Sequence, residues 1–242
     1  MEQTLMEEIR ISGKDLGALA KPDFCPRCFW IQRKAPAGLP YQIFPGIFSS
    51  IDSYSKNIVH TWFDRHGAPP VWLKPLGDII GYIAPPHFSK FNFVDRITGI
   101  RLTGAPDAIL IKRDKSLTIA DYKTAKFTMT QDLMLPVYEI QLNAYALIAK
   151  EINFGDVTDL ALIYTEPVTD KSVADSDTVH TADGFEMGFS AKILKIKLDL
   201  SSIPPLLKST QEILSQKNPP YGRAGCENCQ KINGMLDILK VQ

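Results

Sequence analysis

The sequence of 242 residues lacks a long hydrophobic run, and it lacks a secretory signal. No stretch approaches the ~18 consecutive apolar residues of a membrane-spanning helix, so we expect no membrane association. The N-terminal residues are acidic and do not have the basic start and apolar core of an export signal. A cytoplasmic location is therefore expected.

The chain also has no excess of charge of either sign. Its 27 basic and 27 acidic residues cancel, so no global field draws it to nucleic acid or to an anionic membrane. A non-specific DNA-binding protein usually carries a basic face, and the balance counts mildly against one. Local basic clusters at 112–115 and 192–197 each fit a solvated strand edge. With 45% hydrophobic residues, the chain can bury a substantial core.

Cysteine is scarce but patterned. The four cysteines form two C-x-x-C pairs near opposite ends of the sequence: Cys25, Cys28, Cys226 and Cys229. Without an export signal, structural disulfides are not expected. Two such pairs instead suggest one four-thiolate site for Zn²⁺ or an iron–sulfur cluster. Four unrelated free thiols are the alternative.

The region from 104 to 124 organises the rest of the chain. Two apolar runs, Ala108–Ile111 and Leu117–Ala120, flank a polar turn and predict an antiparallel hairpin. A turn centred on Asp114 places Asp107 opposite Asp121, and opposite residues share a face of the sheet. Side chains alternate along a strand, so Lys123 projects from that face as well.

Burying two carboxylates and an ammonium at one end of a hairpin costs free energy, so we expect these groups to have a function. Holding a divalent cation is such a function. Asp107 and Asp121 suit Mg²⁺, with the backbone carbonyl of Tyr122 as a further ligand. Lys123 would then align a water molecule and offset charge that develops on phosphorus. An ordinary hairpin with a strand-end Asp and a solvated Lys is the alternative.

Pro106-Asp107 followed by Asp121-Tyr122-Lys123 resembles the signature of the PD-(D/E)XK nuclease superfamily. The form Asp-Tyr-Lys-Thr is similar to the RecB-like branch of that superfamily. The resemblance implies an α/β fold with a restriction-endonuclease-like αβββαβ core and a mixed sheet. It also implies cleavage of DNA that depends on Mg²⁺ or Mn²⁺.

The RecB-like branch carries a Q-x-x-x-Y motif on the next helix, and Gln141 and Tyr145 stand in those positions. Four residues apart, they share one helix face and by themselves are unremarkable. The resemblance implies that Gln141 lies near the metal and that Tyr145 contacts nucleic acid. A helix before the sheet often offers a His as a third metal ligand in this branch. His60 is the candidate, and an ordinary surface or core histidine is the alternative.

Some RecB-like nucleases, including AddB-type subunits and CRISPR-associated spacer-acquisition nucleases, hold a [4Fe–4S] cluster. Their usual pattern has one upstream and three downstream cysteines. This chain has two of each, and Met235 stands near the position of the missing last cysteine. The resemblance favours an iron–sulfur cluster, and the departure from the pattern keeps Zn²⁺ open.

Apolar periodicity and turn residues predict the remaining elements. Helices are expected at 12–20, 48–66, 133–152 and 201–216, strands at 78–83, 91–95, 100–103, 159–165 and 193–200, and a loop at 169–184. The prediction for 48–66 rests on the recurrence of Ile51, Tyr54, Ile58 and Trp62. We expect one domain over 1–242, with a catalytic core at about 48–165. Its cysteine-bearing segments, 21–31 and 222–232, would meet at the metal site.

The leading functional interpretation is a metal-dependent deoxyribonuclease acting on single-stranded or end-bearing DNA. A non-catalytic binding or scaffolding subunit of a helicase, repair or CRISPR-type complex is the rival. A nuclease that works only beside a helicase or integrase-type partner protein is a third possibility.

Overall fold

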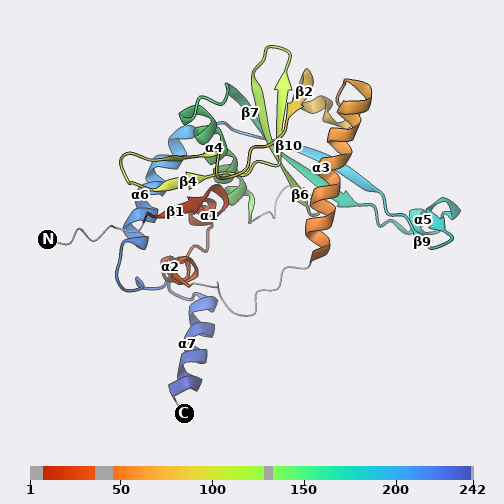
Figure 1. The fold of residues 1–242 in the computed structure, drawn as a ribbon. Coiled ribbons are helices and arrows are strands. Elements are labelled where there is room, and N and C mark those ends of the chain that lie inside the picture. The colour runs from red at the N-terminus through yellow and green to blue at the C-terminus, as the bar shows by residue number, and fades with distance from the viewer. Residues whose placement is uncertain (1–7, 36–45, 128–132, 241–242) are drawn as a thin grey trace.

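The computed structural model describes residues 8–35, 46–127 and 133–240. Its centre is a five-stranded mixed sheet in the order β10-β7-β6-β5-β2 (Figure 1). Strands β6 and β7 run parallel, and the other neighbours are antiparallel. The strands are β2 (Ile79–Ile83), β5 (Ala108–Lys112), β6 (Leu117–Thr124), β7 (Val157–Pro167) and β10 (Phe189–Ile196).

Two long helices cover the two faces of this sheet. Helix α3 (Gly46–His66) packs on one face and α4 (Leu135–Glu151) on the other. Alternate residues of β6 enter the two cores, with Ile119 on the α4 side and Tyr122 on the α3 side. The order α3, β2, β5, β6, α4, β7 confirms the predicted αβββαβ core.

Helix α3 confirms the expected helix, but a different face of it is buried. Val59 and Phe63 pack into the core. Tyr54, Ile58 and Trp62, which supplied the apolar pattern, remain exposed. The buried face of α3 shows no apolar repeat in the sequence, because the residues in its N-terminal half are polar.

Strands β3 (Asn92–Val94) and β4 (Arg101–Thr103) confirm two predicted strands outside the central sheet. They form a three-stranded sheet with β1 (Arg10–Ser12), which runs parallel to β4. Helix α1 (Gly13–Gly17) follows β1 directly and packs against α4. Ser12 caps this helix, because its Oγ accepts a hydrogen bond from the backbone N–H of Asp15 at 3.0 Å.

The segment predicted as a loop at 169–184 contains short regular elements, so that prediction is wrong in part. It holds α5 (Lys171–Ala174), β8 (His180–Thr181) and β9 (Gly184–Phe185). These elements form a lobe that projects from the ends of β7 and β10 (Figure 1). Strand β10 consequently begins four residues before the predicted strand.

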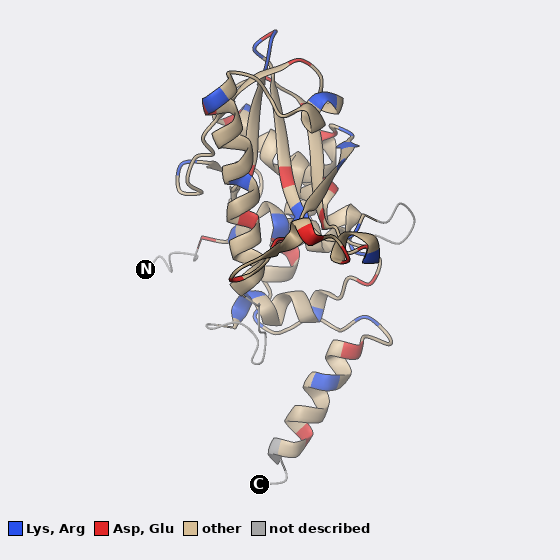
Figure 2. Ribbon diagram, turned by 90° about the vertical axis from the view of Figure 1, so that its right-hand side faces the viewer, with Lys and Arg blue, Asp and Glu red and all other residues tan. Residues whose placement is uncertain are grey.

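Helix α6 (Ile203–Leu214) confirms the last predicted helix and has Pro204 and Pro205 in its first turn. Helices α2 (Pro26–Lys34) and α7 (Glu227–Lys240) carry cysteines, and α7 extends away from the sheet (Figure 1). Short 3-10 helices occupy Ala18–Ala20, Val71–Leu76, Asp177–Val179 and Leu200–Ser202. Acidic and basic residues are interspersed over the ribbon (Figure 2). Within the described ranges, no helix is both long and apolar enough to cross a bilayer.

Candidate active site and cysteine cluster

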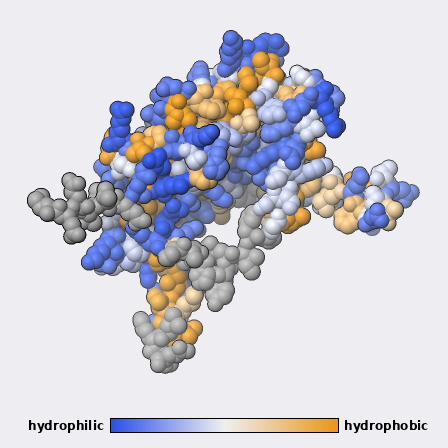
Figure 3. Space-filling model, in the orientation of Figure 1, coloured by the Kyte–Doolittle hydropathy of each residue, from blue (hydrophilic) through white to orange (hydrophobic). Residues whose placement is uncertain are grey.

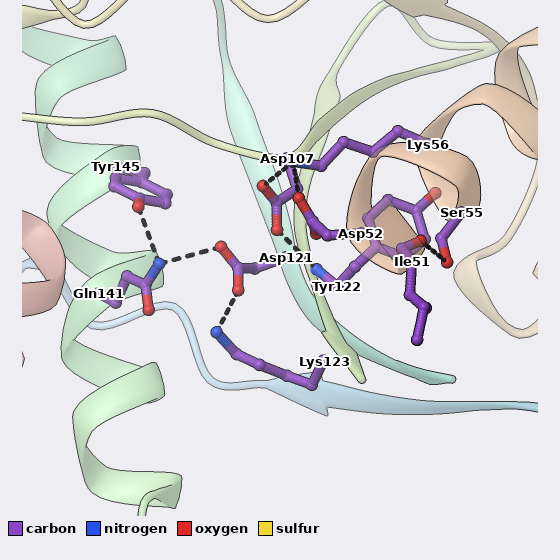
Figure 4. A network of polar contacts seen from close by, with 10 residues as sticks. All are labelled: Ile51, Asp52, Ser55, Lys56, Asp107, Asp121, Tyr122, Lys123, Gln141 and Tyr145. Atoms are coloured by element: carbon purple, nitrogen blue, oxygen red, sulfur yellow. Dashed lines mark hydrogen bonds and ion pairs between the residues drawn. The ribbon is translucent and has the colours of Figure 1, made fainter. Parts of the chain in front are cut away.

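The β5–β6 hairpin brings together the acidic residues predicted from the sequence. Ala108 pairs with Ala120 and Ile111 with Leu117, so the turn is centred on Asp114 as predicted. Asp107 then lies opposite Asp121. The Asp107 Oδ2 atom accepts a hydrogen bond from the backbone N–H of Tyr122 at 2.9 Å (Figure 4).

Asp121 is the most enclosed of these groups, with 4% of its side chain exposed. Burial raises the pKa of its carboxyl group, and the nearby Asp107 carboxylate raises it further. The Lys123 ammonium, which forms an ion pair with Asp121, opposes this shift. Lys123 Nζ also lies 4.0 Å from the ring centroid of Tyr138, a cation–π contact from α4.

The predicted pair on α4 reaches the same place. Gln141 Nε2 donates to Asp121 Oδ1 at 2.9 Å and to the Tyr145 hydroxyl at 2.8 Å (Figure 4). Gln141 Oε1 is buried and has no hydrogen-bond partner among the described residues. Burial raises the pKa of Tyr145, so its hydroxyl stays neutral. At Gly104, a Cβ atom would lie 2.8 Å from the Tyr145 ring, so glycine permits this close approach.

Helix α3 contributes two side chains that the sequence analysis missed. Lys56 Nζ lies 2.7 Å from Asp52 Oδ2 and 2.7 Å from Asp107 Oδ1 (Figure 4). Burial alone would lower the pKa of Lys56, but hydrogen bonds to the two carboxylates raise it. Counting back from Val59 and Phe63 in steps of three or four gives Lys56 and Asp52. That spacing would have placed both residues on the buried face of α3, but only if Val59 and Phe63 had been recognised as the buried residues.

His60 lies one turn beyond Lys56 on α3. Its ring stacks on Tyr82, with centroids 4.2 Å apart and planes at 6°. Burial lowers the pKa of His60. Among the described residues that line the cavity at the carboxylates, His60 does not occur. Its role as a ligand stays a prediction.

The carboxylates face a cavity of about 830 Å³. Its wall includes Asp52, Asp107 and Asp121, and also Arg10 and Phe88. Three carboxylates here face the two ammonium groups of Lys56 and Lys123. These three carboxylates supply several hard oxygen donors at one place, which fits a site for Mg²⁺ or Mn²⁺.

The four cysteines form a second cluster. Cys25 Sγ lies 3.5 Å from Cys229 Sγ, and Cys28 Sγ lies 3.6 Å from Cys226 Sγ. All four sulfur atoms lie within 4.8 Å of one another, and all four cysteines are free. The N- and C-terminal segments therefore meet at one possible metal site, as predicted.

The surroundings of the sulfur atoms suit thiolate ligands. Burial opposes ionisation of Cys25, but hydrogen bonds from the backbone N–H groups of Cys28 and Arg223 lower its pKa to about 6. At Gly222, a Cβ atom would lie 2.7 Å from Cys229 Sγ, so only glycine lets the backbone pass this close. Four sulfur donors at this spacing fit Zn²⁺ or an iron–sulfur cluster.

The sequence matches a model of a known protein family. A family model described as "PD-(D/E)XK nuclease superfamily" matches residues 59–232, which include both hairpin aspartates and the second cysteine pair. No curated protein matches the chain. Among solved structures, one described as "Crystal structure of SSO0001" aligns with 15% identity over 90% of this chain and 81% of its own. Its TM-score is 0.44.

Proposed function

Because this chain belongs to the PD-(D/E)XK nuclease superfamily, we propose that it is a Mg²⁺- or Mn²⁺-dependent deoxyribonuclease. We place it in the RecB-like branch and expect exonuclease-like cleavage of single-stranded or end-bearing DNA. The observation that carries the proposal is the meeting of Asp107, Asp121 and Lys123 at one end of the hairpin, on the wall of an open cavity.

We assign the divalent cation to Asp107 and Asp121, with the Tyr122 carbonyl as a further ligand and Asp52 as an additional carboxylate. A cation bound there would polarise a phosphoryl oxygen and lower the pKa of a water molecule. Gln141 would keep the Asp121 carboxylate in one orientation, because its amide is itself held by Tyr145.

Lys123 would act on the phosphate. When Asp121 binds a cation, the Lys123 ammonium can interact with the negative charge that develops on the phosphate oxygens. The cation–π contact with Tyr138 keeps its flexible side chain near that position. Tyr145 would contact the nucleic acid from α4. His60 would tune the choice of metal from the neighbouring turn of α3.

For the cysteine cluster we propose a [4Fe–4S] centre, with Zn²⁺ as the alternative. Either would fasten the N-terminal and C-terminal segments. Anaerobic purification separates the two, because an iron–sulfur protein is brown and a zinc protein is colourless. A helicase or integrase-type protein is the partner that the RecB-like relationship suggests.

The test is cleavage of end-labelled single- and double-stranded DNA by the purified protein with Mg²⁺ or Mn²⁺. We expect the labelled strand to shorten only with metal, and chelation should stop the reaction. The Asp121→Ala variant, prepared in the same way, is the control for contaminating nucleases. Equal cleavage by that variant, or none by the wild type with either metal, would leave a non-catalytic subunit as the better interpretation.

A further inference from the structure

A second cavity lies on the α3 side of the sheet and has a different character from the first. Its volume is about 560 Å³, and it opens between α3, β7 and β10. Its described lining residues are all uncharged and include the aromatic rings of Tyr54, Trp72 and Phe189. Apolar residues gather at the base of the projecting lobe, where β10 begins (Figure 3).

Two hydroxyl groups in the wall of this cavity are left unsatisfied. The hydroxyls of Tyr122 and Thr165 are buried and have no hydrogen-bond partner among the described residues. These residues are only 6% and 7% exposed. The Tyr122 ring extends from β6 toward Ile51 and Ser55 of α3 (Figure 4). Buried polar atoms normally have partners, so these two hydroxyls are the polar groups of an otherwise apolar wall that a ligand of this cavity could satisfy.

The two cavities share a wall. Tyr122 lines both of them, and it follows Asp121 directly in the sequence. Helix α3 also divides them: Asp52 faces the first cavity, whereas Ile51 and Tyr54 face the second. A DNA strand that passes from the first cavity to the second, past Asp52 and Tyr122, would place a phosphate at the carboxylates and an uncharged, aromatic part beside Tyr54 and Phe189. One nucleotide unit has this division between phosphate and base.

We propose that the second cavity binds one unpaired nucleobase of the substrate strand, beside the phosphate held at the carboxylates. This inference rests on the proposed nuclease function and adds the basis for strand selection. Tyr54 and Phe189 would stack on the base, and the Tyr122 and Thr165 hydroxyls would meet its polar edge. A base within a duplex is already paired and stacked, so only a single strand or a frayed end can place one here.

The aromatic rings provide a direct test. Tyr54 and Phe189 are 64% and 40% exposed, so the double variant Tyr54→Ala/Phe189→Ala should fold normally. We expect it to bind a fluorescein-labelled single strand of DNA at least about fivefold more weakly. Ca²⁺ replaces Mg²⁺ in this measurement to limit cleavage. Binding of a blunt duplex should be unchanged.

The matched control is Trp62→Ala/Phe185→Ala. It removes two exposed aromatic rings, one from α3 and one from β9, and neither of them lines the second cavity. It should bind the single strand like the wild type. Equal melting temperatures for both double variants would show that folding is intact. Loss of binding in the control as well, or in neither variant, would overturn the inference.

An abasic scan identifies the ligand as a base. Moving one abasic nucleotide along the single strand should weaken binding by the wild type at one position. For the Tyr54→Ala/Phe189→Ala variant, the abasic nucleotide should weaken binding at no position. A flat scan with the wild type would contradict the inference. So would a change in self-association, seen by sedimentation of the variant, with DNA binding unaltered, because the cavity would then belong to an interface between copies.

These readouts do not require catalysis. A wild type that binds single strands through the second cavity but never cleaves them would sink the proposed nuclease and keep the base pocket. If the wild type cleaves DNA but its abasic scan is flat, the nuclease function stands and the base pocket is contradicted.

Discussion

The carboxylate cavity and the cysteine cluster both gather ionisable groups from distant parts of the chain, yet they depend on the fold in opposite ways. Asp121 lies on β6 and Asp107 directly precedes its partner strand β5, between two hydrophobic cores, so the sheet would hold their backbone in place without any ligand. Helix α7 has no such support. Of its residues with described burial, only Cys229 is buried.

The fold forms the carboxylate site without a metal, whereas the cysteine site helps to hold the fold together once its metal is bound. A metal held by preformed strands adds chemistry. A metal held by segments with little packing of their own adds folding free energy, because no preformed site exists in the unfolded chain. Four predictions separate these roles, beginning with the largest expected effect.

Replacing Cys229 with Ser should be the most damaging change to folding. Thiolate binding to a structural metal contributes on the order of 10 kcal/mol, and one lost ligand forfeits much of it. We expect a collapse in soluble yield and loss of bound metal, measured by elemental analysis. The Asp121→Ala protein, made alongside, should retain both. If Cys229→Ser accumulates with normal yield and melting temperature, the cluster is not holding the fold.

The variants Asp107→Ala and Asp121→Ala should each abolish cleavage, because each removes a proposed cation ligand, and should melt close to the wild-type temperature. Activity on end-labelled DNA and a thermal melt provide the two measurements. Asp78→Asn is the control, since that carboxylate pairs with Arg113 at the other end of the hairpin. Cleavage by either alanine variant at the wild-type rate would remove the proposed metal site.

Lys123→Ala should lower the cleavage rate about 10²- to 10³-fold, the usual effect of losing one charge-stabilising donor. The metal concentration for half-maximal activity should change much less. Titration of Mn²⁺ at saturating DNA separates the two quantities. Lys115→Ala, in the exposed turn of the same hairpin, should behave like the wild type. A large rise in the required metal concentration with an unaltered rate would contradict this assignment.

His60→Ala should have the smallest effect. An imidazole ligand suits Mn²⁺ better than Mg²⁺, so activity with Mn²⁺ should fall more than activity with Mg²⁺. Rates measured in parallel with the two metals test this, with His66→Ala on the same helix as the control. Equal losses with both metals would return His60 to a packing role on Tyr82.

Local patterns were sufficient for the central hairpin. Two apolar runs and the polar turn between them are encoded within a few residues, so the pairing of Ala108 with Ala120 followed directly. The i, i+4 spacing likewise placed Gln141 and Tyr145 on one face of α4. The expectation that Gln141 lies near the carboxylates came from the family resemblance, since periodicity does not say what a helix face contacts.

Features that depend on distant partners escaped the sequence. The parallel pairing of Arg10 with Arg101 leaves no local pattern, because each strand is only three residues long. Asp52 and Lys56 were missed because the apolar repeat of α3 lies on its exposed face, whereas these two residues lie on its buried face. The second cavity could not be foreseen either. It exists only where α3 and β10 approach each other, and the orphaned hydroxyl of Tyr122 is visible only after folding.

The position of the cysteine cluster has a mechanical consequence. Cys28 and Cys226 are 198 residues apart in sequence, and the whole five-stranded central sheet lies between them. With a metal bound, tension applied to the two chain ends is carried across the metal–thiolate bonds, and the intervening residues feel almost none. The protein should then resist pulling until those bonds rupture. In an optical-trap record, that rupture would precede every extension step from the sheet. After chelation, the sheet would bear the load from the start.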